Sequence, residues 1–360
     1  MNSIKSLTLD ELTERFVAAG EPGYRAKQVI QWLYEKRVRD FRGMTNLPAA
    51  LRDRLTEEYT DRPLELVRTI GSVDTTRKFL FRLNDGQLIE TVLIPASRGA
   101  DGDVAGRRTL CVSSQVGCAY GCRFCASGLD GWKRNLDAGE IVDQLLQAEE
   151  IAGERVDNIV FMGMGEPFAN FEQLMKAVTI INAPWGPNVG ARHVTVSTSG
   201  LAPRIRDLAD QPLQVRLAVS LHGATDEVRD RIMPVNRKHP LEELLAACAY
   251  FCERKKQKIT FEYILIEGVN DSTDQAIALS RLVRKLNAKV NLIPYNTVDG
   301  LEWVRPAEEV MEAFVDILHA GKVAATLRRE KGHDISAACG QLRLQTERVE
   351  KPVADATVVL

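Results

Sequence analysis

Three cysteines lie close together in the first half of the chain, at Cys118, Cys122 and Cys125. Their C-x3-C-x2-C spacing offers three thiolates, and Gly121 lets the backbone between them wrap around an inorganic core. A cubane of four irons held by three thiolates keeps one iron without a protein ligand. That iron can chelate the amino and carboxylate groups of S-adenosylmethionine. The spacing therefore predicts a 4Fe–4S cluster that binds S-adenosylmethionine.

A zinc site is the alternative interpretation of these cysteines. Zinc prefers four tetrahedral ligands, often in paired knuckles, and the sequence has no second C-x2-C pair. The seven cysteines are an odd number and three of them cluster, which favours metal or redox chemistry in a reducing compartment over a disulfide framework. We therefore expect a cytoplasmic protein. A zinc-stabilised, non-catalytic RNA-binding protein stays open as a function of a different class.

Glycines and polar side chains follow several of the later apolar runs. The run 163–167, GMGEP, has glycines that permit close backbone approach to a ligand, and Glu166 can accept a hydrogen bond from the ammonium of a methionine moiety. Hydroxyl, imidazole and amide groups stand at the ends of three further runs, at Ser197, Ser220, His222 and Asn296. Together they could bind ribose and carboxylate, although each taken singly is also typical of caps and turns.

The remaining cysteines divide into two kinds. Cys248 and Cys252 are four residues apart on an apolar helical stripe, which predicts core residues. Cys111 lies on the strand that enters the cysteine motif, and Cys339 lies in a loop of small residues near the end of the chain. Both could face the site, and burial as structural thiols is the alternative.

The elements that must position these residues alternate between strand and helix. After Arg108, apolar runs near 109–114, 157–162, 193–198, 214–220, 258–265 and 289–294 are separated by amphipathic helical segments. Such units build a parallel sheet, and ligands gather at the carboxyl ends of its strands. We predict an α/β fold with a partial (β/α) barrel, a small N-terminal helical module and a short linking β-sheet.

The predicted organisation has four parts. Residues 1–62 form a helical RNA-binding module that opens with a capping box at Thr8 and Glu11. Residues 63–107 form the linking β segment and a loop, 108–348 form the barrel with a catalytic C-terminal loop, and 349–360 form a tail.

Charge is balanced over the chain and uneven along it. The 360 residues carry a formal net charge of −2, so indiscriminate phosphate binding is excluded, and no apolar run approaches a membrane span. Between Arg25 and Arg54, however, eight Lys or Arg face three acids, with Trp32, Tyr34 and Phe41 interleaved. A solvated helix surface and an RNA-contacting surface are equally compatible with this pattern.

Taken in order, these segments resemble the motifs of one known family. The matching residues are 109–118, the cysteine motif 118–125, the GMGEP run 163–167, Ser220-Leu221-His222, and 334–342 with its ACGQL sequence. The chain resembles the radical S-adenosylmethionine RNA adenine methyltransferases, the RlmN and Cfr family, over nearly its whole length.

The resemblance implies specific roles for these residues. Cys118, Cys122 and Cys125 hold the cluster. Contacts to S-adenosylmethionine come from Gly165, Glu166, Ser197, Ser220, Leu221, His222 and Asn296. Cys339 is methylated on sulfur and carries the methyl group, Cys111 is its redox partner in a disulfide, and Glu90 is the proton acceptor. From the sequence alone, Glu90 is an ordinary outward-facing strand residue.

The resemblance also implies a radical route that consumes two molecules of S-adenosylmethionine per methyl group. The first methylates Cys339, and the second yields a radical that activates the S-methyl group for addition to an adenine carbon, through a covalent protein–RNA intermediate. Pro167 favours carbon 2, as in RlmN, whereas the Cfr branch tends to carry alanine there and methylates carbon 8. Lys331 stands where many members have arginine.

The partners implied are 23S ribosomal RNA of the peptidyl transferase region, transfer RNA beside the anticodon, and an external one-electron reductant such as flavodoxin. We expect a monomer that does not associate with membranes.

Overall fold

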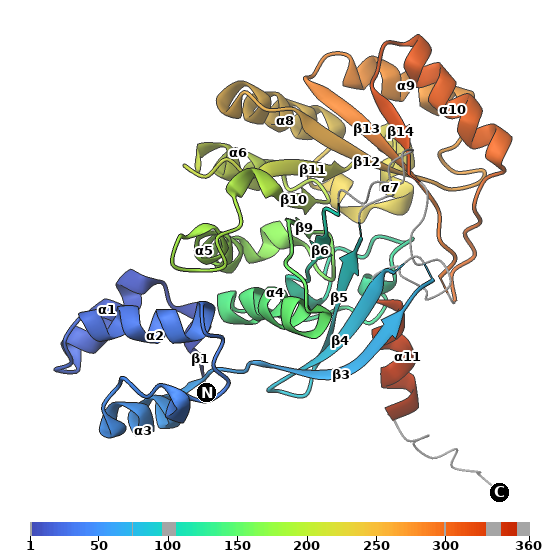
Figure 1. The fold of residues 1–360 in the computed structure, drawn as a ribbon. Coiled ribbons are helices and arrows are strands. Elements are labelled where there is room, and N and C mark those ends of the chain that lie inside the picture. The colour runs from blue at the N-terminus through green and yellow to red at the C-terminus, as the bar shows by residue number, and fades with distance from the viewer. Residues whose placement is uncertain (1, 74, 96–105, 299, 329–339, 351–360) are drawn as a thin grey trace, which may run out of the picture.

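The structure, a computed structural model, describes residues 2–73, 75–95, 106–298, 300–328 and 340–350 (Figure 1). Cys339, Lys331 and most of the expected tail lie outside these ranges. The predicted domain limits stay a prediction.

Three helices form the N-terminal part of the chain: α1 (Leu9–Ala18), α2 (Tyr24–Tyr34) and α3 (Ala49–Glu58). The predicted capping box begins α1, where the Thr8 hydroxyl accepts from the Glu11 N–H at 3.2 Å and the Glu11 carboxylate accepts from the Thr8 N–H at 2.8 Å. Strand β1 (Asn2–Ser3) pairs in parallel with β2 (Tyr59–Thr60), which brings the two ends of this part together. A short 3-10 helix, η1 (Ile4–Ser6), leads from β1 toward α1.

Ten strands of the described chain form one sheet in the order β14-β13-β12-β11-β10-β9-β6-β5-β4-β3. Its parallel part consists of β6 (Thr109–Cys111), β9 (Asn158–Phe161), β10 (Val194–Thr198), β11 (Arg216–Ser220), β12 (Ile259–Leu265), β13 (Ala288–Pro294) and β14 (Ala325–Leu327). Its antiparallel part consists of β3 (Leu64–Gly71), β4 (Arg77–Leu83) and β5 (Leu88–Ile94). The sheet does not close into a barrel, so the α/β, partial-barrel prediction is confirmed. The linking strands continue the main sheet, because β5 pairs with β6.

Helices follow the parallel strands as the alternation predicts. They are α4 (Ala138–Ala152), α5 (Phe171–Asn182), α6 (Ala202–Asp210), α7 (Asp226–Ile232), α8 (Leu241–Lys255), α9 (Thr273–Val283) and α10 (Glu308–Ala320). In Figure 1, α4, α5, α6 and α8 follow one another along one side of the sheet, and α11 (Gln341–Glu350) lies on the other side of β3 and β4. No helix within the described ranges is both long enough and apolar enough to cross a membrane.

The N-terminal helices dock on α4 through charged and polar contacts. Lys5 forms a buried ion pair with Asp143, and the Ser6 hydroxyl donates to Asp137 at 2.9 Å. Arg37 pairs with Glu149 of the same helix. Arg37, a member of the basic run, therefore holds the N-terminal helices against α4. This docking role differs from both predictions for the basic run, a solvated surface and an RNA-contacting surface.

Candidate active site

A cavity of about 380 Å³ lies at the carboxyl ends of the parallel strands. Ten of the predicted site residues line it: Cys111, Cys118, Cys122, Cys125, Gly165, Glu166, Ser197, Ser220, His222 and Asn296. Three others do not. Leu221 packs in the core, Glu90 lies behind the cavity wall, and Cys339 is outside the described residues.

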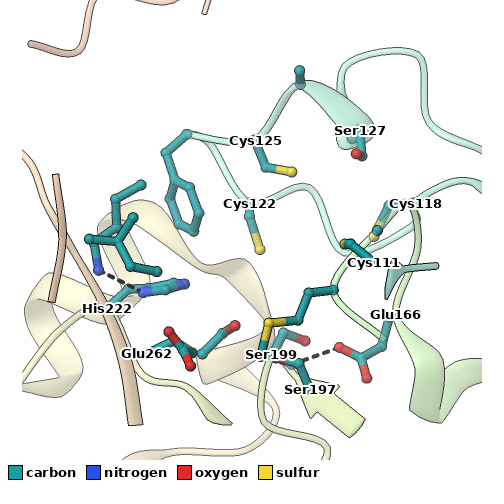
Figure 2. Close-up of a pocket in the computed structure, with 18 of the residues that line it drawn as sticks. Cys111, Cys118, Cys122, Cys125, Ser127, Glu166, Ser197, Ser199, His222 and Glu262 are labelled. Atoms are coloured by element: carbon teal, nitrogen blue, oxygen red, sulfur yellow. Dashed lines mark hydrogen bonds between the residues drawn. The ribbon is translucent and has the colours of Figure 1, made fainter. Parts of the chain in front are cut away.

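The three clustered cysteines lie in the long connection of a β-hairpin. Strand β7 (Gln115–Gly117) pairs antiparallel with β8 (Trp132–Asn135), and the Cys118 N–H donates to the Gly131 carbonyl at 3.1 Å. Gly117 has φ +71°, and a Cβ atom there would lie 1.9 Å from that same carbonyl oxygen, so the hairpin requires glycine. Figure 2 shows the thiol groups of Cys118, Cys122 and Cys125 around one space, together with Cys111.

The chemistry of these thiols fits an iron–sulfur cluster. Burial raises the pKa of Cys118 to about 12, and burial followed by the charges of Cys125 and Cys118 raises that of Cys122. Clustered thiolates are therefore unstable here without a bound cation. Among the described residues no three His, Cys, Asp or Glu side chains are placed to hold a single metal ion. A cubane takes its thiolates at separate iron corners, which suits groups spread around a cavity.

Glycines in the 163–167 run serve packing within the chain. A Cβ atom at Gly163 would lie 2.6 Å from the Val112 carbonyl oxygen, and one at Gly165, where φ is +97°, would lie 2.5 Å from the Gln115 Cβ. These glycines therefore admit the segment that leads from β6 into the cysteine hairpin. Both also line the cavity, and their predicted approach to a ligand stays a prediction.

Glu166 connects two of the loops that line the cavity. Its carboxylate accepts from the Ser199 N–H at 2.7 Å and from the Phe168 N–H at 3.0 Å (Figure 2). Burial raises the pKa of this carboxyl, and hydrogen bonds from Ser199, Phe168 and Thr198 oppose that rise. Glu166 lines the cavity, where its carboxylate could accept from a cationic ligand group.

His222 acts as a hydrogen-bond donor toward the cavity. Its backbone is left-handed, with φ +55°, and its Nδ1 accepts from the Ile264 N–H at 3.0 Å. Burial, followed by the charge of Arg229, lowers the pKa of His222 to about 3, so the ring is neutral and carries its proton on Nε2. The edge of the ring packs against Phe124 of the cysteine loop, with ring centroids 4.9 Å apart.

Sequence reasoning missed Glu262 on β12. Its carboxylate lines the cavity, is 6% exposed, and accepts from the Asn291 amide at 2.6 Å. Burial raises its pKa. A lone acid inside the apolar run 258–265 was the available signal, because an acid is rarely buried without a partner or a function.

Sequence reasoning also missed Arg229 on α7, which is fully buried beneath the cavity. Its guanidinium donates to the carbonyls of Ser199 and Ser220, each at 3.1 Å, and to the Asn236 amide oxygen at 2.8 Å. Burial lowers the pKa of Arg229 to about 10, so it is charged at neutral pH. Arg229 thus ties the end of β10 to the end of β11.

Two further predicted site residues lie on the adjacent strands β5 and β6. Cys111 on β6 is 6% exposed and lines the cavity. Glu90 on β5 is 2% exposed and does not line the cavity, and its carboxylate accepts from the Gly340 N–H at 2.9 Å and the Arg343 N–H at 2.6 Å. The expectation of an outward-facing Glu90 is therefore wrong, because its side chain is buried and holds Gly340, the residue after Cys339, and the first turn of α11.

The remaining cysteines lie in and beside the core of α8. Cys248 is buried, and the Cys252 thiol lies 3.6 Å from the Asn287 carbonyl. The prediction that both are core residues is confirmed for Cys248, while Cys252 is only partly buried.

Comparisons with known proteins match both parts of the chain. Residues 112–279 match the family model of the radical SAM superfamily, and residues 3–60 match that of the ribosomal RNA large subunit methyltransferase N-terminal domain. The chain is 55% identical to a probable dual-specificity RNA methyltransferase RlmN from Opitutus terrae, covering 97% of this chain and 96% of that one. It is 53% identical to a protein of the same description from Akkermansia muciniphila, covering 96% of each.

A solved structure has the same fold. The crystal structure of a radical SAM methyltransferase from Sphaerobacter thermophilus is 48% identical to this chain, covers 95% of it, and superposes with a TM-score of 0.88 over 99% of its own length.

Proposed function

The chain belongs to the RlmN family of radical SAM RNA methyltransferases, and on this premise we propose that it methylates carbon 2 of adenine in 23S ribosomal RNA and in transfer RNA. The observation that carries the proposal is one cavity lined by the three clustered cysteines, the polar strand ends and Cys111. Pro167 also lines the cavity, and it supports carbon 2 over the carbon-8 chemistry of the alternative branch.

The cofactors of the superfamily are a 4Fe–4S cluster and S-adenosylmethionine, and this cavity suits both. Cys118, Cys122 and Cys125 would hold the cluster. The side chains of Glu166, Ser197, Ser220, His222 and Asn296 would contact S-adenosylmethionine, together with the backbone at Gly165 and Leu221. When bound, the cluster supplies one electron to the sulfonium of S-adenosylmethionine and so starts the radical transfer.

A cysteine carrier is needed because the acceptor carbon is electron-poor. Adenine carbon 2 has no usable lone pair, so direct displacement on a sulfonium methyl is closed to it. The Cys339 thiolate can accept the methyl group by ordinary displacement and carry it to the base in a covalent adduct.

Release of the product then falls to Cys111, which lines the cavity, and to Glu90 on the neighbouring strand. The ring radical of the adduct would return one electron to the cluster, the proton on carbon 2 would pass to the Glu90 carboxylate, and the Cys111 thiolate would attack the Cys339 sulfur. The bond from that sulfur to the transferred carbon breaks, the freed carbon takes a proton and becomes the methyl group, and a Cys111–Cys339 disulfide forms that cellular thiols reduce.

RNA would reach the cavity as an unstacked adenine. The N-terminal helices would contact phosphates through the exposed members of the basic run, while the target base leaves its stack to enter the cavity. An external one-electron reductant such as flavodoxin would load the cluster, and the protein would work as a monomer in the cytoplasm.

Mass spectrometry of RNA tests the position of the methyl group. RNA from a strain lacking the gene should lack 2-methyladenosine at the ribosomal and transfer RNA sites, and the wild-type gene should restore it. Recovery of 8-methyladenosine instead would favour the carbon-8 alternative.

Anaerobic purification tests the class of protein. The wild type should be brown with a broad visible band, and Cys122→Ala should lose both iron and the cleavage of S-adenosylmethionine, since two thiolates cannot hold a cubane with an open iron. A colourless protein with stoichiometric zinc would favour the non-catalytic RNA-binding module.

A further inference from the structure

A buried ion pair lies in the antiparallel part of the sheet, where the sequence alone predicted no buried charge. The Lys78 ammonium on β4 donates to the Glu90 carboxylate on β5 at 3.0 Å. The side chains are 0% and 1% exposed, respectively. Burying two charges costs several kcal/mol per ion before their attraction offsets it, so a buried pair is weak evidence for stability.

Strand register places this pair on the same sheet face as Cys111. In the pairing of β4, β5 and β6, Lys78 lies opposite Val92, and Val92 lies opposite Cys111. Glu90 is two residues before Val92 on β5, so its side chain is on that face as well. The three functional groups are therefore neighbours across adjacent strands, and this face is covered by α11, whose Leu342 packs with Leu80 and Leu88.

The Glu90 carboxylate also fastens the segment that follows Cys339. It accepts from the backbone N–H groups of Gly340 and Arg343. Gly340 has φ +88°, and a Cβ atom there would lie 2.8 Å from the Ser127 nitrogen in the loop after the last clustered cysteine. The end of the loop that contains Cys339 is thus held between Glu90 and the cysteine hairpin.

Within the described residues, the charged groups beside Glu90 come from β4 and α11. Lys78 comes from β4. Arg343 comes from α11; its guanidinium pairs with Glu347 at 3.0 Å and Asp130 at 3.4 Å, and its backbone N–H donates to Glu90. On β6, Cys111 is the neighbour across Val92. Among the described side chains, that of Lys78 donates directly to the carboxylate.

We propose that Lys78 is a positioning residue that holds the Glu90 carboxylate in place as the proton acceptor for the adduct on Cys339. The inference rests on the proposed function of Glu90. Without the Lys78 ammonium, one carboxylate oxygen loses the side-chain donor that fixes it, and Glu90 is no longer held in the orientation that takes the carbon-2 proton. The covalent protein–RNA adduct would then persist.

The test measures the rate at which that adduct is released, in the reconstituted full-length enzyme with an RNA fragment. In Lys78→Met, the adduct should accumulate on denaturing gels, and its release should slow by about tenfold, as expected for the loss of one charge-assisted hydrogen bond. Lys78→Arg, which keeps the charge and the donor, should restore release.

A matched control separates this role from stability. Lys5→Met removes another buried ion pair, with Asp143, at the contact between the N-terminal helices and α4. It should lower the melting temperature without adduct accumulation. If Lys78→Met does not fold, Lys78→Gln, which keeps a hydrogen-bond donor on a shorter, uncharged side chain, should show the same slow release.

The Glu90→Gln variant distinguishes failure of the proposed function of Glu90 from failure of the inference about Lys78. If Glu90→Gln releases the adduct at the wild-type rate, the proposed role of Glu90 is wrong. If Glu90→Gln traps the adduct while the release rate of the folded Lys78 variant matches the wild type, Lys78 is a structural residue only and the inference is overturned.

Discussion

The parallel and antiparallel parts of the sheet serve the site in different ways. Parallel strands bring polar groups at their carboxyl ends to the cavity, as at Ser197 and Ser220, because strand direction alone sends them to one edge. The antiparallel strands β4 and β5 bring Lys78 and Glu90, which are buried and do not line the cavity, so only register and the covering helix α11 decide their role. A polar residue at a strand end can be recognised in the sequence as a site candidate, whereas the pairing of these two residues cannot.

Cys111 lies where the two parts meet, because β6 pairs antiparallel with β5 and parallel with β9. We expect Cys111→Ala to lose turnover completely and to retain RNA covalently on Cys339, since it keeps the methyl carrier and lacks only the resolving thiol. A denaturing gel should show a slow band that nuclease trims to one nucleotide-bearing peptide.

Cys248→Ala is the matched control, because it removes a buried thiol from α8, away from the cavity. It should turn over normally. If Cys111→Ala protein with a methylated Cys339 shows no such band, another group resolves the adduct. The proposed role of Cys111 at the junction of the two parts of the sheet would then be wrong.

Substitution of Arg229 tests whether the loops at the carboxyl ends of the parallel strands are held in place before a ligand binds. Arg229→Lys keeps the charge but loses hydrogen bonds to the ends of β10 and β11, so the loops that line the cavity should loosen. We expect about 2 kcal/mol less stability and roughly tenfold weaker binding of S-adenosylmethionine, measured by denaturation and by calorimetry. Lys255→Met removes another cation that is bonded to backbone carbonyls, including Leu213 at 3.0 Å, and should lower stability alone. Equal binding in both variants would make Arg229 a stabilising residue only.

His222 gives the parallel side a pH dependence with a definite sign. Its pKa is lowered from 6.5 to about 3 in the folded chain, so the unfolded chain binds the extra proton between these values. Stability should therefore fall as pH drops from 6.5 toward 3, by about 1.4 kcal/mol per pH unit, in protein purified without the cluster. His222→Gln should flatten this slope in urea titrations, while substitution of the exposed His193 should not. An unchanged slope in His222→Gln would assign the acid sensitivity to other groups.

The N-terminal helices lie outside both parts of the sheet, and we expect the smallest effect there. Lys36 is exposed and lies over the Trp32 ring at 3.7 Å, so it is available to a phosphate in a way that the paired Arg37 is not. Lys36→Glu should weaken RNA affinity a few-fold and reduce its salt dependence, as measured by filter binding. Lys285→Glu, at the exposed end of α9, is the control. If Lys36→Glu and Lys285→Glu bind RNA with equal affinity, the basic run serves only as a solvated surface and as the contact with α4.

The sequence by itself determined the cysteine motif, the strand–helix alternation and the set of polar strand ends. These are local features: thiol spacing follows from neighbouring residues, and the side to which a parallel strand end points follows from chain direction. Ten residues named from such features line one cavity. The glycines at 163 and 165 were singled out for close approach to a ligand, and the structure adds a second reason for them, their close approach to Val112 and Gln115.

Only the tertiary structure decided the roles of Arg229, Glu262 and the Lys78–Glu90 pair. Each depends on partners far away in sequence: carbonyls of two other loops for Arg229, an amide on the next strand for Glu262, and α11 for Glu90. A one-residue change of register would turn Glu90 to the α4 face, where Thr91 now donates to Gln144. Register and burial arise from the packing of the whole chain, so a local pattern of residue types gives at most a hint, such as the lone acid at Glu262 in an apolar run.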